Sequence, residues 1–182
     1  DDGSNWTEAA SYGDTVRFTN TPDTVTEVYV TGDRGSDITV SGVGITAAAG
    51  DITNLVNGDN SSNSQFDWNV STIAAGDSIK YVFSSAKTIT EYKYYTHNTM
   101  ASVAAPKMGD WKWQGSNDGS SWTDIGGTFN FNQPSLSTTY TSMSDNTTSY
   151  TQYQMVCVTP PHSNGNPWHR EIEFQEYNAT SV

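Results

Sequence analysis

The sequence predicts an all-β fold, an antiparallel jelly-roll β-sandwich with extra strands at the N-terminus. Helical patterning is nearly absent, because no window of a dozen residues keeps apolar side chains at the spacing of one helix face. Apolar and polar residues alternate instead over short stretches, which is typical of strands that bury one face. Clusters of Gly, Asn, Asp and Ser separate these stretches. Short strands joined by such turns favour a sandwich or jelly roll.

Thin strands come first in the chain and are expected at residues 15–19, 25–31 and 37–40. Aromatic residues are few before the Ala-rich stretch that follows these strands. We therefore interpret residues 1–46 as an N-terminal extension or a set of outer strands, and residues 47–182 as the jelly-roll domain. No internal repeat is apparent, which disfavours propellers and solenoids.

Stronger patterning marks the strands of the expected core. Four of them place apolar residues at every second position, and two more are extended and rich in β-branched or aromatic residues. In chain order, these six strands are expected at residues 79–83, 89–96, 111–113, 138–142, 153–157 and 171–174. Between Trp113 and Trp122, the run Asn117-Asp118-Gly119 supplies the positive φ that a tight hairpin turn needs.

The composition disfavours several classes of protein. A formal net charge of −12, with only 8 Lys+Arg, argues against nucleic acid or an anionic membrane surface as a partner. No membrane insertion is expected, since no apolar run reaches the roughly 18 to 20 residues of a membrane span. Aromatic residues make up 12% of the chain, which argues for a packed core and against disorder. The single Cys157 excludes an internal disulfide.

Catalytic motifs give little support to an enzyme. Gly76-Asp77-Ser78 spells the start of a family of serine esterases, whose catalytic histidine follows an aspartate by three residues. None of the three histidines has an aspartate at that spacing, so the motif is better interpreted as a turn before a strand. With 20 Asp and Glu residues, a glycosidase pair can be nominated anywhere and carries no weight. We therefore expect a protein that is not an enzyme.

An oxygen-rich loop is the best candidate for a metal site. Residues 54–62 gather amide, carboxylate and hydroxyl groups around Gly58, which allows the sharp turn that brings several oxygens to one cation. Calcium suits such ligands. A distant acid would have to complete the site, and periodicity does not separate Glu171 from Glu173. The alternative interpretation is a polar turn without a metal.

Three segments carry a resemblance to a known family. Residues 81–92 and 106–125, the latter with the run Gly115-Ser116-Asn117-Asp118-Gly119 before Trp122, resemble the discoidin, or coagulation factor V/VIII C-type, family. Residues 164–174 are similar to the closing strand of that family's galactose-binding-like carbohydrate-binding modules. The resemblance covers roughly residues 50 to 178.

The resemblance implies a galactose-binding-domain-like jelly roll, usually non-catalytic, whose loops at one end bind glycans and, in other members, lipids or proteins. It also implies a structural calcium ion as cofactor. The residues at the matching positions are Asn54, through its carbonyl, Asn57, Asp59 and Ser62 from the loop, with the Arg170 carbonyl and Glu171 from the last strand. Asn57 stands where the family has Asp, which removes one negative charge.

The sugar site implied by the resemblance lies on loops near the same end. Polar side chains there form hydrogen bonds with the sugar hydroxyl groups, while an aromatic ring stacks on the apolar face of the sugar. The candidate ligand-binding residues are Asp67, Trp68, His97, Asn98, Asn164, Asn166 and Trp168. Ala104-Ala105-Pro106 departs from the Arg-Asp-Pro that is common in the family's middle loop. Trp111, Trp113 and Trp122 match structural positions and are expected in core or hairpin packing.

We therefore expect a non-catalytic, lectin-like module that recognises cell-surface or polysaccharide glycans, within a larger extracellular protein or a protein of a cell or virion surface. The alternative is a structural or adhesion domain, for example of a viral fibre, a capsid surface or a surface layer, that contacts other protein subunits of an assembly. The extra N-terminal residues favour this alternative slightly, because an assembly protein could use them for strand exchange or docking.

Overall fold

The computed structural model describes residues 4–12, 15–22, 24–61, 64–96, 109–130, 137–161 and 168–180. The chain divides into two compact units. One combines the N-terminal strands up to Val28 with the chain from Tyr177 onward, and the other runs from Tyr29 to Glu176. In the described ranges, neither of the two short helical segments has the length and apolar character of a membrane span.

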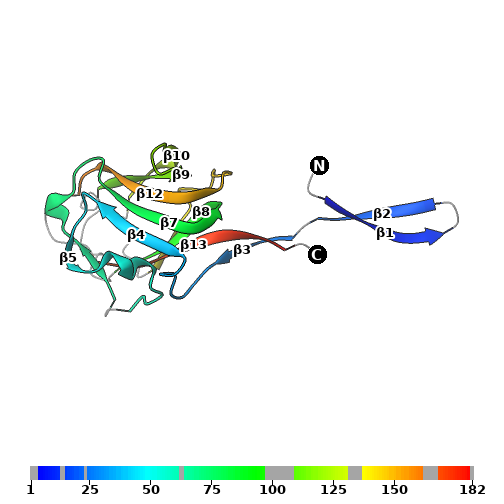
Figure 1. The fold of residues 1–182 in the computed structure, drawn as a ribbon, viewed down its shortest axis with the longest axis horizontal. Helices are drawn as coiled ribbons and strands as arrows, with labels where there is room; N and C mark the ends of the chain where they lie inside the picture. The colour runs from blue at the N-terminus through cyan, green and yellow to red at the C-terminus, as the bar shows by residue number, and fades with distance from the viewer. Residues whose placement is uncertain are drawn as a thin grey trace. The chain divides into compact units, whose positions relative to one another are not determined.

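Two sheets build the larger unit (Figure 1). The first follows the order β10 (Thr123–Phe129), β9 (Asp110–Ser116), β12 (Tyr150–Thr159), β7 (Ser78–Lys87) and β4 (Ile38–Val43). The second follows the order β11 (Ser137–Tyr140), β8 (Ile89–Thr96), β13 (Trp168–Thr180), β6 (Phe66–Trp68) and β5 (Ala47–Gly50), and β3 (Thr24–Tyr29) pairs with β13. The short helices are η1 (Ile52–Val56) and η2 (Val70–Thr72).

Every strand pair with a defined register in the described ranges is antiparallel. The prediction of an antiparallel all-β sandwich is therefore confirmed.

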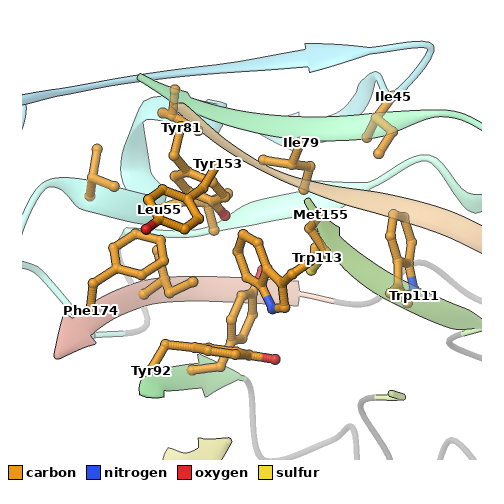
Figure 2. Packing of buried hydrophobic residues seen from close by; sticks show 14 of the residues in the cluster. Ile45, Leu55, Ile79, Tyr81, Tyr92, Trp111, Trp113, Tyr153, Met155 and Phe174 are labelled. Carbon is orange, nitrogen blue, oxygen red and sulfur yellow. The ribbon is translucent and has the colours of Figure 1, made fainter. Parts of the chain in front are cut away.

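Aromatic side chains fill the space between the two sheets (Figure 2). Tyr81 on β7 and Trp113 on β9 meet Phe174 on β13 and Tyr92 on β8, and all four side chains are fully buried. The ring centroids of Tyr81 and Phe174 lie 5.2 Å apart, and those of Trp113 and Tyr92 lie 5.1 Å apart. Both pairs meet edge to face, an arrangement that adds stability beyond the burial of apolar area.

The hairpin between β9 and β10 turns at the expected residues. The Asp118 carboxylate accepts hydrogen bonds from the backbone N–H groups of Ser121 (2.7 Å) and Ser120 (2.8 Å), which hold the pKa of Asp118 well below its usual range. Gly119 has a φ of +71°, a conformation that favours glycine. Trp122 packs at the hairpin, where the Lys80 ammonium lies 5.2 Å from its ring centroid.

The first 46 residues contribute to more than one sheet. β1 (Ser4–Tyr12) and β2 (Thr15–Pro22) pair with each other in a two-stranded sheet, whereas β4 pairs with β7 as an outer strand of the five-stranded sheet. The backbone N–H of Val30 donates to the Phe174 carbonyl (3.4 Å). The compact unit that holds the jelly roll thus begins at Tyr29, whereas the sequence places the start of that domain at residue 47.

The aromatic core predicts a large effect of one truncation. Trp113→Ala is expected to lower the free energy of unfolding by about 3–5 kcal/mol, because it leaves a cavity between the sheets. Urea denaturation measures the change. Val43→Thr is the control, since Val43 is 53% exposed on an outer strand, and its change is expected to stay within about 0.5 kcal/mol. Similar losses in the two variants would contradict the packing described above.

Candidate functional site

Two consecutive side-chain turns fold the loop between η1 and β6. The Oδ1 atom of Asn57 accepts a hydrogen bond from the Asp59 N–H (2.9 Å), and the Asp59 carboxylate accepts one from the Ser61 N–H (2.8 Å). Gly58 has a φ of +78°, and a β-carbon at this position would collide with the backbone of Gly32. Glycine is therefore required where this loop meets the segment before β4.

Strand β13 brings Glu171 to the same loop. Glu171 is only 2% exposed, and its Oε2 atom accepts a hydrogen bond from the Gly58 N–H (2.9 Å). Burial raises the pKa of Glu171 to about 8. The negative charges of Glu173, Asp33 and Asp59 add to this rise, and the Gly58 hydrogen bond opposes it. At this loop, the buried carboxyl group of Glu171 therefore lies close to three other acidic side chains.

The other predicted calcium ligands cluster around this loop. The Asn57 amide nitrogen donates to the Asn54 Oδ1 atom (3.3 Å), and the Arg170 guanidinium donates to the Asn60 carbonyl (3.2 Å). Ser62 lies outside the described residues. The fold therefore brings together residues that are more than one hundred positions apart in the sequence, from η1 to β13.

Spacing along the chain does not identify two of the acids near the loop, although the family resemblance points to one of them, Glu171. Of the two acids on β13 that periodicity does not separate, Glu171 reaches the loop, while the Glu173 carboxylate accepts a hydrogen bond from the Tyr95 hydroxyl (3.0 Å). Asp33 is a site residue that sequence reasoning missed, because it lies well upstream of the loop and no spacing pattern links the two.

The donor set is one of oxygen atoms, which suits a hard cation such as calcium. Among the described residues, no group of three or more His, Cys, Asp or Glu side chains comes together as a metal cluster. Amide and backbone carbonyl oxygens would therefore have to supply most of the ligands beside Glu171. Calcium accepts such ligands, whereas zinc prefers histidine and cysteine.

A second group of predicted residues meets at the start of β13. Trp168 pairs with Asp67 on β6, and the Trp168 indole donates a hydrogen bond to the Asp67 carboxylate. Asp67 is 8% exposed, and burial raises the pKa of its carboxyl group, an effect that the hydrogen bond from Trp168 opposes. Trp168 itself is 38% exposed. A buried carboxyl group thus fixes an aromatic ring at the surface.

Trp68 lies in the core, which corrects its assignment to the ligand site. It is fully buried, and its ring stacks on the His169 imidazole with centroids 3.9 Å apart, close to Trp111. Burial lowers the pKa of His169 well below its ordinary value, so this imidazole is neutral. The remaining candidates, His97, Asn98, Asn164 and Asn166, lie outside the described residues.

Solved structures resemble this chain, although no protein-family model and no curated protein sequence matches it. The C-terminal domain of a chitobiase from Bacteroides fragilis gives a TM-score of 0.60 at 14% identity, over 85% of this chain and 100% of that chain. A family 32 carbohydrate-binding module from Clostridium perfringens NanJ, in complex with galactose, gives 0.58 at 12% identity, over 84% and 100%.

A second family 32 module from Clostridium perfringens, in complex with GalNAc-β-1,3-galactose, gives a TM-score of 0.57 at 14% identity, over 76% of this chain and 95% of that chain. At these identities the similarity is one of fold. The chain therefore has the fold of the family 32 carbohydrate-binding modules.

Proposed function

We propose that this chain is a non-catalytic carbohydrate-binding module whose ligand contacts the Trp168 end of the sandwich. The observation that carries the proposal is the exposed Trp168 indole, which a hydrogen bond to buried Asp67 holds at the start of β13. The fold of modules solved with galactose and with GalNAc-β-1,3-galactose supports a sugar as the ligand, and binding rather than catalysis as the activity.

We call the surface formed by Asp67 and Trp168 the Trp168 corner, and its chemistry suits a sugar. The apolar face of a pyranose ring packs on an indole, and sugar hydroxyls donate hydrogen bonds to carboxylates. Asp67 acts as a positioning residue, because it fixes the indole before the ligand arrives and so reduces the entropy lost on binding. The Oδ1 atom of Asp67 is itself buried and has no hydrogen-bond partner among the described residues, so Asp67 supports the ring from below the surface.

We also propose a structural calcium ion at the loop between η1 and β6. The residues that would hold it are Asn54, Asn57, Asp59, Ser62, Arg170 through its carbonyl, and Glu171. The donor chemistry supports the proposal, since the loop is rich in oxygen atoms and Glu171 is buried beside further acids. A bound cation would neutralise this carboxylate and stabilise the loop.

The proposed setting is a larger extracellular protein, or a protein at a cell surface. A domain of the same fold is the C-terminal part of a chitobiase, so this fold occurs as an attached domain of an enzyme. The formal net charge of −12 favours a neutral partner such as a glycan over nucleic acid.

A second candidate function is protein–protein contact in an assembly. The β1–β2 hairpin favours it, because among the described strands these two pair only with each other. An isolated two-stranded sheet is only marginally stable in water. A partner that packs on this hairpin or extends its sheet would stabilise it.

Glycan binding is tested with a glycan array, followed by calorimetry on the best ligand. Trp168→Ala is expected to weaken binding about tenfold or more, because the sugar loses its stacking surface. Val158→Ala, which changes another exposed apolar side chain, is the control and should bind as the parent protein does. The proposed site would be contradicted if the protein binds no glycan on the array, or if Trp168→Ala binds its ligand with unchanged affinity.

Calcium binding is tested by thermal unfolding. Adding calcium is expected to raise the Tm of the parent protein, since a ligand that binds only the folded state stabilises it. Glu171→Gln should abolish the rise. Glu173→Gln is a matched control on the same strand and should keep it, because Glu173 pairs with Tyr95 instead. If calcium does not raise the Tm of the parent protein, the proposed calcium site is wrong.

The pH dependence of stability without calcium gives a separate test. The pKa of Glu171 is raised from 4.5 to about 8 on folding, so between these values the folded state binds more protons than the unfolded state. The contribution of Glu171 to stability is therefore full below the lower value and is lost as the pH rises through this window. Glu171→Gln is expected to flatten this slope in denaturation curves, and an unchanged slope would contradict the burial of an acid at this position.

A further inference from the structure

A polar pocket lies between the edge strand β10 and the turn that precedes β12. Its volume is about 140 Å³. The residues that line it are Thr123, Asp124, Ile125, Gly126, Asp145, Asn146, Thr147, Thr148 and Tyr150. None of them belongs to the Trp168 corner or to the proposed calcium loop.

The length of strand β8 gives the distance between this pocket and the Trp168 corner, because each of them lies near one end of the strand. The Asn146 amide nitrogen donates to the carbonyl of Ile89, the first residue of β8 (2.9 Å). Thr96, the last residue of β8, pairs with His169, the neighbour of Trp168. At about 3.3 Å per residue, the seven steps along β8 place its two ends about 23 Å apart. The pocket is thus a separate site near the opposite end of the strand.

Buried hydrogen bonds fix the floor of the pocket. Asn146 is 7% exposed, and its amide nitrogen also donates to the Tyr153 hydroxyl (3.2 Å), while its Oδ1 atom accepts from the Thr148 N–H (3.1 Å). Met143, in the same turn, is fully buried in the core. Asn146 and the backbone at Thr148 are therefore held in place before a ligand binds, which lowers the cost of binding.

Tyr150 supplies an aromatic wall. Its ring lies against Gly115, where a β-carbon would collide with it, and stands at 90° to the ring of Tyr153 with centroids 5.7 Å apart. The residue is half-buried, so one part of it is packed and another part faces solvent. An aromatic ring is one feature of small-molecule sites, and here polar groups make up most of the remaining lining.

The charge of the lining restricts the class of ligand. Asp124 and Asp145 are both exposed, and no lining residue is cationic. Lys112 pairs with Asp124 (2.9 Å), whereas Asp145 has no ion pair in the described part of the chain. Carboxylates accept hydrogen bonds from hydroxyl groups and repel anions. The Thr147 and Thr148 side chains add exposed hydroxyls, so the pocket suits a neutral polyhydroxylated ring.

We propose that this pocket is a second ligand site, which takes one neutral monosaccharide unit. The inference shares its ligand class with the proposed function but stands on a separate set of residues. A chain with a site at each end of β8 contacts two sugar units at once on a polysaccharide or on a dense glycan surface. Its apparent affinity for such surfaces then exceeds that of either site.

Amide NMR shifts of the full-length ¹⁵N-labelled chain test the proposal. The probes are the methyl glycosides of galactose, glucose, mannose, N-acetylgalactosamine and N-acetylglucosamine, with galacturonic acid as the anionic comparison, each titrated to tens of millimolar. At least one neutral glycoside is expected to shift the amides of Thr147 and Thr148, equally in the parent protein and in Trp168→Ala. Galacturonic acid should leave these amides unshifted.

Asp145→Ala is expected to weaken binding in the pocket about tenfold or more, because a hydrogen bond to a charged acceptor is lost. Asp145→Asn keeps the size and shape of the side chain. Its amide spectrum in the absence of sugar should match that of the parent protein, which checks that the fold is unchanged. The proposal is overturned if no neutral glycoside shifts these amides, if Asp145→Ala binds as the parent does, or if the shifts vanish in Trp168→Ala. Shifts in the pocket without shifts at Trp168 would support this site and contradict the proposed function.

Discussion

The structure depends on the register of β13, because this one strand serves the core and both candidate sites. Phe174 packs between the sheets, Glu171 reaches the loop after η1, and Trp168 reaches the surface. The pairing with β8 is irregular between His169 and Glu171, where Arg170 is the extra residue of a bulge. A bulge changes which face each side chain occupies. A slip by one residue would turn each side chain of the strand to the opposite face of the sheet.

Two buried acids on β13 have opposite surroundings. The carboxylate of Glu176 forms ion pairs with Arg34 (2.7 Å) and with Lys87 (2.9 Å), so its charge is compensated within the protein. Glu171 receives a backbone hydrogen bond from Gly58 and has no ion pair among the described residues. Because an uncompensated buried charge is costly, the two positions differ in what they require from solution. The same physical rule thus explains a structural ion pair at Glu176 and a candidate cation site at Glu171.

Local patterns predicted the strands with alternating apolar residues, but not β1, β5, β6 or β10. Burial that depends on distant pairing was predicted less well. Trp111 and Trp113 alternate with a polar residue, and both are buried as expected. Trp68 stands between Asp67 and Asn69, a local pattern typical of a loop, yet pairing of β6 with β5 and β13 buries it. The pocket beside β10 left no pattern in the sequence, because two segments that meet only in the folded chain form it.

The pairing of β3 with β13 has a consequence for how such a domain evolves. The hydrogen bond between Val30 and Phe174 places the strand that enters the compact unit next to the strand that leaves it. A unit with neighbouring entry and exit strands fits into a surface loop of a host protein without pulling the flanking segments apart. The same geometry makes the unit transferable between unrelated hosts, since a host needs to supply only two adjacent attachment points.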